Sequence, residues 1–187
     1  MIFYLVRHGQ TDWNNERRFQ GQLDIPMNET GIRQMCDLAD RLVEAGVRVD
    51  TMIASPLDRA RKSAEIIAEK TGFQKEIIFD ELLMERYCGI LQGELWQPGL
   101  DLDDPKYKME TIPELCGRAE KVLEKYSFSE DEHVMIVSHG GLLTALKAVL
   151  SGYKMDYHNK PSVPVLQGNV LCCVREAGKE AVFYNLF

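Results

Sequence analysis

Two kinds of segment alternate along the chain when its hydrophobic and polar positions are compared. Short, continuously apolar runs bounded by glycine, proline or polar residues are typical of buried strands. Longer segments with apolar residues three and four positions apart are typical of helices that cover a sheet. The apolar runs predict strands at 2–6, 49–54, 76–79, 133–138, 170–175 and 181–184. The periodic segments predict helices at about 30–45, 55–72, 112–126 and 141–150.

The alternation of strands and helices also predicts the fold class. Strands that alternate with helices favour a mostly parallel central sheet covered by helices on both faces. We therefore expect an α/β protein with a three-layer α/β/α sandwich. The chain has 187 residues, a length that suits one domain with one core, so we expect a single domain over 1–187.

Residues at the helix ends add detail to the first two helices. Thr30 is placed to cap the first helix, and Gly46 follows its last turn. Ser55 is placed to cap the second helix, with Pro56 in its first turn and Gly72 after its end. The face of the first helix that we expect to be buried consists of Ile32, Met35, Ala39, Leu42 and Val43.

The first predicted strand leads into the run Leu-Val-Arg-His-Gly-Gln-Thr-Asp-Trp-Asn at 5–14. A histidine is a nucleophile near neutral pH, an arginine binds anionic oxygens, and a glycine lets them approach the backbone. Arg7, His8 and Gly9 are therefore suited to phosphoryl chemistry. A single histidine at a strand end is more often a structural residue hydrogen-bonded to a neighbour, so this interpretation needs support from elsewhere in the chain.

Matching segments follow two later strands. Residues 134–141 are Val-Met-Ile-Val-Ser-His-Gly-Gly, and residues 53–61 are Ile-Ala-Ser-Pro-Leu-Asp-Arg-Ala-Arg. In open sheets of this class the site lies at the carboxyl ends of the strands, so both segments should meet His8 there. Arg59 and His139 stand at predicted helix N-termini, which favour phosphate. The two glycines after His139 would let phosphoryl oxygens approach the backbone.

Four motifs that carry this chemistry occur in a fixed order. They are Arg7-His8-Gly9 with Thr11 and Asn14, then Ser55-Pro56-Leu57 with Arg59 and Ala60, then Glu85, and then Ser138-His139-Gly140-Gly141. In combination they resemble the motifs of the histidine phosphatase superfamily, also called the phosphoglycerate-mutase-like family. The resemblance extends from Met1 to about Asn169 and implies a phosphoglycerate-mutase-like fold.

The resemblance also implies roles for the site residues. His8 would be the nucleophile of a two-step phosphoryl transfer through a phosphohistidine, and Glu85 would protonate the leaving oxygen and later activate water. The transferring oxygens would be held by Arg7, Arg59 and His139. Substrate contacts would come from Asn14, Gln20, Gly21, Arg86 and Gly140. No metal and no cofactor is expected, because arginine and histidine would supply the positive charge.

Several features favour the phosphatase branch of this family. Segment 94–110 would form only a short lid, whereas mutases carry a large insertion there. Gly141 stands where similar mutases have asparagine and Cys88 where they have tyrosine, although Glu85-Arg86 and the Leu-Gln-Gly at 91–93 resemble mutases. A short lid excludes water less well, so a phosphohistidine would be hydrolysed. We expect a phosphomonoester hydrolase acting on small phosphorylated metabolites. A cofactor-dependent phosphoglycerate mutase, a phosphoprotein phosphatase and a non-catalytic phosphate-binding protein remain open as well.

Charge and composition limit the partners. The formal net charge of −7 and the isoelectric point near 5.2 argue against nucleic acid or an anionic membrane as a partner. An anionic substrate must then be attracted locally by clustered arginines. No segment approaches the ~20 apolar residues of a membrane span, and the apolar run at 2–6 is too short for a signal peptide.

The remaining residue types suggest a cytoplasmic protein. The five cysteines are odd in number and show no C-x-x-C spacing, so we expect reduced thiols. Cys88 could be redox-sensitive, but a small buried side chain is the simpler interpretation. His133 and His158 match no motif and are expected to be structural or at the surface. An interface of a homodimer, or simply the last edge of the core, could be formed by Phe183, Tyr184 and Phe187.

Overall fold

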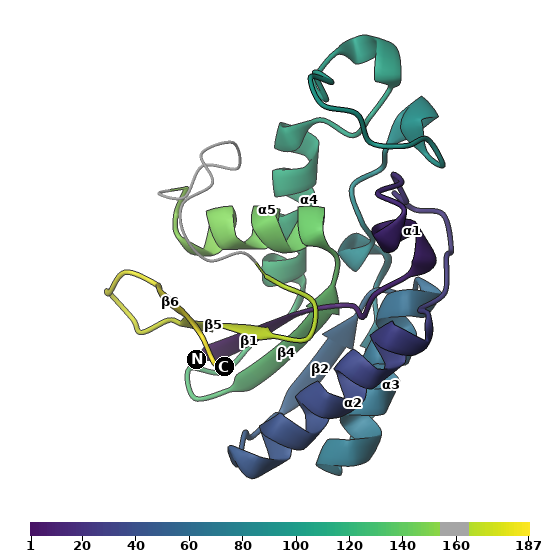
Figure 1. Cartoon of the computed structure of the whole chain (residues 1–187). Helices are drawn as coiled ribbons and strands as arrows, with labels where there is room; N and C mark the ends of the chain where they lie inside the picture. The colour runs from purple at the N-terminus through teal and green to yellow at the C-terminus, as the bar shows by residue number, and fades with distance from the viewer. Residues whose placement is uncertain (154–164) are drawn as a thin grey trace.

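A six-stranded sheet forms the centre of the computed structural model, which describes residues 1–153 and 165–187 (Figure 1). Its strands are β1 (Ile2–Arg7), β2 (Thr51–Ala54), β3 (Ile78–Phe79), β4 (His133–Ser138), β5 (Val170–Val174) and β6 (Val182–Asn185). They lie in the order β3-β2-β4-β1-β5-β6. β3, β2, β4 and β1 pair in parallel, and β5 runs antiparallel to both of its neighbours. The predicted mostly parallel sheet is therefore confirmed.

Helices cover both faces of this sheet (Figure 1). One face is covered by α2 (Glu29–Glu44) and α3 (Asp58–Thr71), and the other by α4 (Ile112–Lys125) and α5 (Gly140–Leu150). The three-layer α/β/α arrangement agrees with the sequence prediction. Shorter helical turns that the hydrophobic pattern does not predict lie in the connecting loops, namely α1 (Asp12–Asn15), η1 (Glu81–Leu83), η2 (Gly89–Leu91) and η3 (Pro105–Tyr107).

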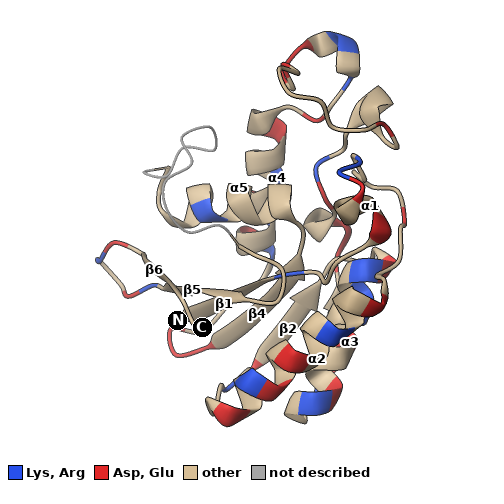
Figure 2. Ribbon diagram, in the orientation of Figure 1, with Lys and Arg blue, Asp and Glu red and all other residues tan. Residues whose placement is uncertain are grey.

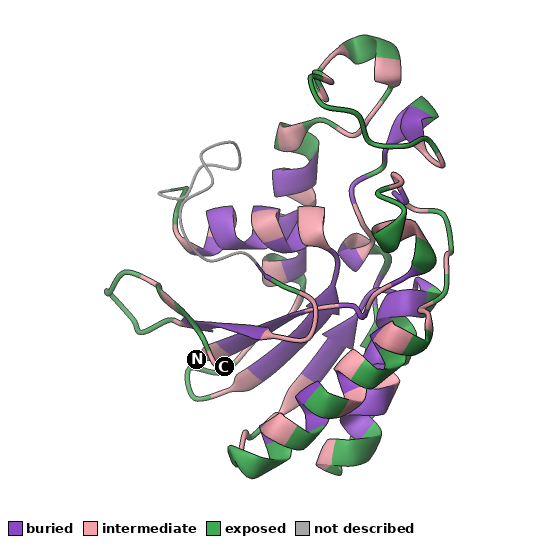
Figure 3. Cartoon of the chain, viewed as in Figure 1, coloured by how far each residue is buried: buried purple, intermediate pink, exposed green. Residues whose placement is uncertain are grey.

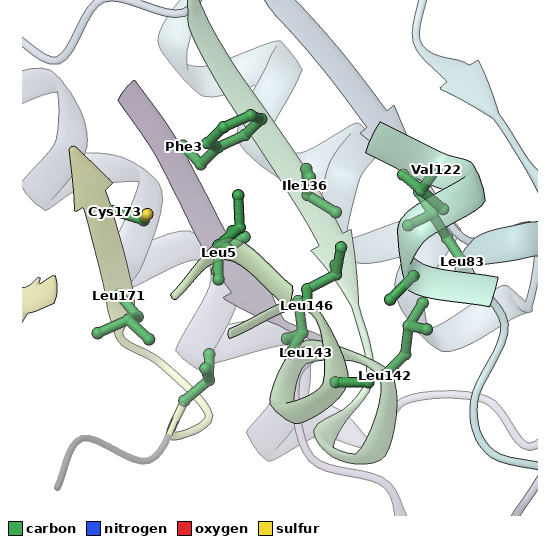
Figure 4. Close-up of a cluster of buried hydrophobic side chains, with 14 of the residues drawn as sticks. Phe3, Leu5, Leu83, Val122, Ile136, Leu142, Leu143, Leu146, Leu171 and Cys173 are labelled. Carbon is green, nitrogen blue, oxygen red and sulfur yellow. The ribbon is translucent and has the colours of Figure 1, made fainter. Parts of the chain in front are cut away.

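The side chains of β1 divide the core into two halves. Phe3 and Leu5 point toward α4 and α5 and join the apolar cluster drawn in Figure 4. Tyr4 and Val6 point to the opposite face and pack with residues of α2 and α3. Because successive side chains of a strand point to opposite faces, a strand buried on both must be apolar throughout. Figure 3 shows the buried central strands β1, β2 and β4, and exposed outer surfaces on α2 and α3.

The start and the buried face of α2 differ from the prediction. Asn28, rather than Thr30, is the N-cap residue, because its side-chain oxygen accepts a hydrogen bond from the N–H of Gly31 at 2.9 Å. Ile32 and Val43, expected in the core, are 41% and 52% exposed. The helix instead buries Met35, Leu38, Ala39 and Leu42, whose spacing of three, one and three residues keeps them on one face.

The predicted cap of α3 is also wrong. The N-cap residue is Leu57, which makes no side-chain capping bond, so Pro56 precedes the helix instead of lying in its first turn. The N–H of Asp58 donates to the carboxylate of Asp24, 2.6 Å away. Asp24 therefore supplies the acceptor at this helix end, while the hydroxyl of Ser55 contacts another site residue.

Charged residues of both signs are interspersed over the outer surfaces of α2 and α3, whereas the strands carry few (Figure 2). Within the described ranges, no helix has the length and apolarity needed to cross a bilayer.

The three C-terminal aromatic residues considered for a dimer interface differ in burial. Phe183 and Phe187 each pack against one of the two apolar clusters, while Tyr184 is 43% exposed. The homodimer stays a prediction. His158 lies outside the described residues.

Candidate active site

The carboxyl ends of β1 and β4 bring two histidines together. Arg7 is paired with Ser138 in the parallel register, and the N–H of His8 donates to the carbonyl of Ser138 at 3.0 Å. His8 and His139 are the next residues of their strands, and their ring centroids lie 5.1 Å apart. The site is thus assembled by sheet register from residues about 130 positions apart in sequence.

His8 is held in the form that a nucleophile needs. Its side chain is buried, and its Nδ1 lies 2.7 Å from the carbonyl oxygen of Gly9. A carbonyl can only accept a hydrogen bond, so Nδ1 carries the proton and Nε2 keeps its lone pair. Burial lowers the pKa of His8 well below its usual value, and the positive charges of Arg59 and Arg7 lower it further. The ring is therefore neutral at physiological pH.

His139 is buried beside it with one ring nitrogen already bonded. Its Nε2 lies 2.8 Å from the hydroxyl oxygen of Ser55. Ser55 is the first residue after β2. The Nδ1 of His139 is buried and has no hydrogen-bond partner among the described residues. Burial lowers the pKa of His139 well below its usual value, with Arg59 and His8 as further causes. A neutral His139 that accepts from Ser55 would carry its proton on Nδ1.

Arg59 brings a positive charge into the interior. Its side chain is fully buried, and its two terminal nitrogens donate to the carbonyls of Leu23 and Gly21, each at 2.8 Å. These bonds fix the guanidinium, while its Nε has no partner among the described residues. Burial lowers the pKa of Arg59 to about 10, although the carboxylates of Glu85 and Asp24 oppose this shift.

Arg7 supplies a second guanidinium with an unused donor. Its Nε is buried and has no partner among the described residues. Burial lowers the pKa of Arg7, whereas Glu85 raises it. A Cβ atom added at Gly140 would lie 3.5 Å from Arg7 Cζ, so Gly140 packs directly against this guanidinium.

Arg7, Arg59 and His139 together contribute three buried nitrogen atoms that have no partners in the described chain. This pattern is expected where several anionic oxygens bind.

Glu85 lies against the N-terminus of α5. Its Oε1 accepts from the N–H groups of Arg86 and Gly141 at 2.9 Å and of Leu142 at 3.2 Å. Its Oε2 has a single longer contact in the described part of the chain, 3.3 Å from the nitrogen of Gly141. The carboxylate is thus oriented by one oxygen, with the other left for a ligand. A Cβ atom at Gly141 would come within 2.5 Å of Oε1, so a larger residue here would displace the Glu85 carboxylate.

Three of the predicted substrate residues lie in α1 and in the loop that follows it. The side-chain oxygen of Asn14 accepts from Thr11 in a capping box and from Gln167, and within the described residues its amide nitrogen is left to donate to a ligand. Gly21 has a φ of +53° and presents its carbonyl to Arg59. The side chain of Gln20 is buried, and its Oε1 has no partner among the described residues.

The side chain of Arg86, also predicted to contact substrate, points to segment 94–110 instead. Its Nε donates to the carbonyl of Glu110 at 2.7 Å, and one terminal nitrogen lies 3.3 Å from both the carbonyl of Leu102 and the carboxylate of Asp103. The guanidinium thus holds segment 94–110 and lines a cavity of about 460 Å³ between that segment and α4. The structure does not bring it to the His8 cluster.

The thiol of Cys88 is buried close to the site. It contacts the carbonyl of Arg86 at 3.4 Å, and burial raises its pKa to about 12. A thiol with so high a pKa has almost no reactive thiolate at neutral pH. The structure therefore favours the interpretation of Cys88 as a small buried side chain.

Sequence reasoning missed Arg118 on α4, which holds the loop that carries Glu85. The pattern contains a signal, because Arg118 follows Leu115 by three residues and precedes Val122 by four, on the apolar face of its helix. A charged residue on such a face needs buried partners. The role of Ser55 was likewise missed, because a serine before a helix has the same appearance whether it caps that helix or contacts a histidine.

A family model described as the histidine phosphatase superfamily (branch 1) matches residues 3–185. The chain belongs to the histidine phosphatase superfamily. Among its relatives in this superfamily is a metal-independent phosphoserine phosphatase of Arabidopsis thaliana, 35% identical over 157 residues, or 76% of this chain and 65% of that protein. An Escherichia coli protein named "Probable phosphoglycerate mutase GpmB" is 36% identical over 163 residues, or 80% of this chain and 74% of that protein.

Solved structures of phosphatases resemble this one over nearly its full length. The structure of a mycobacterial glucosyl-3-phosphoglycerate phosphatase with VO3 matches with a TM-score of 0.77 and 26% identity, over 98% of this chain and 96% of that chain. Phosphatases are therefore among the proteins that share both the fold and the family of this chain.

Proposed function

We propose that the protein is a phosphomonoester hydrolase that acts on small phosphorylated metabolites through a phosphohistidine on His8. One observation carries the proposal: a neutral His8, whose Nε2 keeps its lone pair, lies beside His139 and feels the charges of Arg7 and Arg59, and these three residues have buried nitrogens without partners in the described chain. A phosphoryl group needs this combination of a nucleophile and fixed donors. Glu85, with one carboxyl oxygen left for a ligand, supplies the proton donor that a non-catalytic phosphate-binding protein does not need.

In the proposed first step, Nε2 of His8 attacks phosphorus, and the bond from phosphorus to the leaving oxygen breaks. Glu85, in its protonated form, transfers its proton to that oxygen, which leaves as an alcohol. In the second step, water attacks the phosphohistidine and gives its proton back to Glu85, and the bond between nitrogen and phosphorus breaks to release phosphate. Arg7 and Arg59 stabilise the negative charge on the equatorial oxygens in both steps.

Hydrolysis is favoured over mutase chemistry by the segment that would cover the site. Every residue of 94–110, all within the described chain, is exposed or only partly buried. In Figure 1 the teal segment that precedes α4 projects from the top of the molecule. A mutase must protect its phosphohistidine from water, and a segment that packs so loosely would do this poorly.

The positive charges at the site support catalysis without a metal, and the cysteines suit a reducing compartment. Arginine and histidine donors supply the positive charge at the site, and none of the five cysteines, all in described parts of the chain, forms a disulfide. The net charge of −7 suits a small substrate bound by local arginines better than a nucleic acid or a membrane surface.

Phosphate release from a panel of phosphomonoesters, with and without EDTA, tests the proposal. The panel includes phosphoserine, p-nitrophenyl phosphate, 3-phosphoglycerate assayed for isomerisation, and a phosphoprotein. We expect release from small monoesters that survives EDTA, disappears in His8→Ala and persists in the control His133→Asn, which lies at the other end of β4.

Three results would overturn the proposal, and each indicates a different function. Isomerisation of 3-phosphoglycerate without net release of phosphate would indicate a mutase. Activity on the phosphoprotein but on no small monoester would indicate a phosphoprotein phosphatase. A protein that binds phosphate but turns over no member of the panel would be a non-catalytic phosphate-binding protein.

A further inference from the structure

Arg118 holds the loop that carries Glu85 through hydrogen bonds from its two terminal nitrogens. Its Nη1 donates to the carbonyls of Leu82 and Met84, and its Nη2 donates to the carbonyl of Glu85 at 3.1 Å. Its Nε and Nη2 bind the two carboxylate oxygens of Glu110 at 2.8 and 2.7 Å. Both partners of this ion pair are only 14% exposed. One guanidinium therefore fixes three carbonyls on the residues that lead into Glu85.

The carbonyl of Glu85 is held from a second direction. The side-chain nitrogen of Gln22 donates to it at 3.1 Å, so this oxygen accepts bonds from both Gln22 and Arg118. The carboxylate of the same residue is bonded by the N-terminus of α5. Both the backbone and the carboxylate of Glu85 are thus fixed, which is what a proton donor needs to meet a leaving oxygen in the right place.

Glu110 connects this arrangement to the end of segment 94–110. Its carboxylate also accepts from the N–H of Tyr87 at 3.1 Å, and its own N–H donates to the carbonyl of Tyr87 at 2.9 Å. Arg118 therefore joins the residues before Glu85 to the residues after it through Glu110. Its hydrogen bonds in the described chain go to this loop and to Glu110 rather than to the His8 cluster, so its effect on chemistry would pass through Glu85.

We propose that Arg118 is the positioning residue for the proton donor of this enzyme, and that it acts by fixing the Glu85 loop. The proposal rests on the proposed function, in which Glu85 protonates the leaving group. A lysine at 118 would keep the positive charge, which also lowers the pKa of His139, but it cannot span three carbonyls and a carboxylate with one planar group. Arg118→Lys therefore removes the hydrogen-bonding geometry of the guanidinium while it keeps the positive charge.

The role of Arg118 is measured by comparing two substrates whose leaving groups differ in their need for a proton. p-Nitrophenyl phosphate releases a phenolate that needs little protonation, whereas phosphoserine releases an alkoxide that needs a proton donor. We expect Arg118→Lys to lower kcat for phosphoserine about 100-fold with a KM within a few-fold of wild type, and kcat for p-nitrophenyl phosphate far less. In a Glu85→Gln background, Arg118→Lys should have little further effect on phosphoserine turnover, because the two residues act as one unit.

Two further variants complete the experiment. Arg33→Lys is the matched control, because Arg33 is an exposed arginine on α2 and should show wild-type kinetics. If Arg118→Lys does not give a cooperative thermal transition, Glu110→Asp is measured instead, since a shorter carboxylate displaces Arg118 while keeping the ion pair. We expect it to show the same leaving-group selectivity, to a smaller extent.

Equal losses on both substrates, with full additivity in the Glu85→Gln background, would overturn the proposal and leave Arg118 a purely structural residue. Glu85→Gln alone distinguishes this failure from a failure of the proposed function. If Glu85→Gln is selective for phosphoserine but Arg118→Lys is not, only the positioning role falls. If Glu85→Gln shows no selectivity, Glu85 is not the proton donor and both proposals fall.

Discussion

At the scale of single residues, the site depends on which atoms are already bonded and which are not. His8 and Glu85 each commit one polar atom to a neighbour, to the carbonyl of Gly9 and to the N-terminus of α5. The second atom of each, Nε2 and Oε2, is left for chemistry. The residue types could be predicted from sequence motifs, but this division of atoms could not, because it depends on side-chain orientations that only the folded chain defines.

Gly141 offers a direct test of the Glu85 position. A methyl group there would meet Oε1 at 2.5 Å, so Gly141→Ala should displace the carboxylate and lower kcat for phosphoserine about 100-fold. Gly117→Ala is the matched control, because a Cβ at Gly117 in α4 meets nothing within 4 Å. This control should keep full activity and gain about 0.5–1 kcal/mol in stability, since alanine is the better helix former. Wild-type turnover in Gly141→Ala would show that the Glu85 contact is not needed.

The lowered pKa values of His8 and His139 predict how stability varies with pH. As the pH falls below about 6.5, both histidines take up protons in the unfolded chain but not in the folded protein. The free energy of unfolding should therefore decrease by up to about 1.4 kcal/mol per pH unit for each histidine. Urea unfolding at pH 7.5 and pH 5.0 should show a smaller decrease for His8→Asn than for wild type. Identical decreases would mean that His8 takes up a proton in the folded protein.

At the scale of elements, the existence and type of the main strands and helices could be predicted, whereas the helix starts could not. Two candidate caps stand two residues apart at the start of α2, and the pattern alone favours Thr30 over Asn28. The choice is decided by the loop before the helix, where the amide of Asn28 also donates to Gln10 and Asp12. Such contacts between loops leave no periodic signal in the sequence.

Substitution of the two candidate caps tests this assignment. Asn28→Ala removes the acceptor for the N–H of Gly31 and should lower the free energy of unfolding by about 1 kcal/mol. Thr30→Ala removes only an exposed contact with Arg33 and should change stability by much less. Denaturant unfolding of both variants decides between them, and a larger loss in Thr30→Ala would restore Thr30 as the cap.

At the scale of the whole molecule, the parallel sheet explains why residues from four distant segments form one site. The carboxyl ends of β1, β2 and β4 meet at one edge, so the convergence of Arg7, His8, Arg59 and His139 could be predicted from the parallel sheet that the alternating pattern indicates. Glu85 and Arg118 could not be placed in this way, because a loop and a helix on one face of the sheet carry them. The site follows from topology, and the position of the proposed proton donor follows from packing.

The identity of the phosphorylated atom tests the central claim most directly. The protein would be mixed with phosphate-labelled phosphoserine, quenched in alkali within milliseconds to seconds, digested with trypsin and mapped by mass spectrometry. We predict one phosphoryl group per chain, stable in alkali and lost in acid, on the peptide that begins at His8 and ends at Arg17. A label on another residue, or undiminished turnover with no labelled enzyme at any time, would contradict a phosphohistidine at His8.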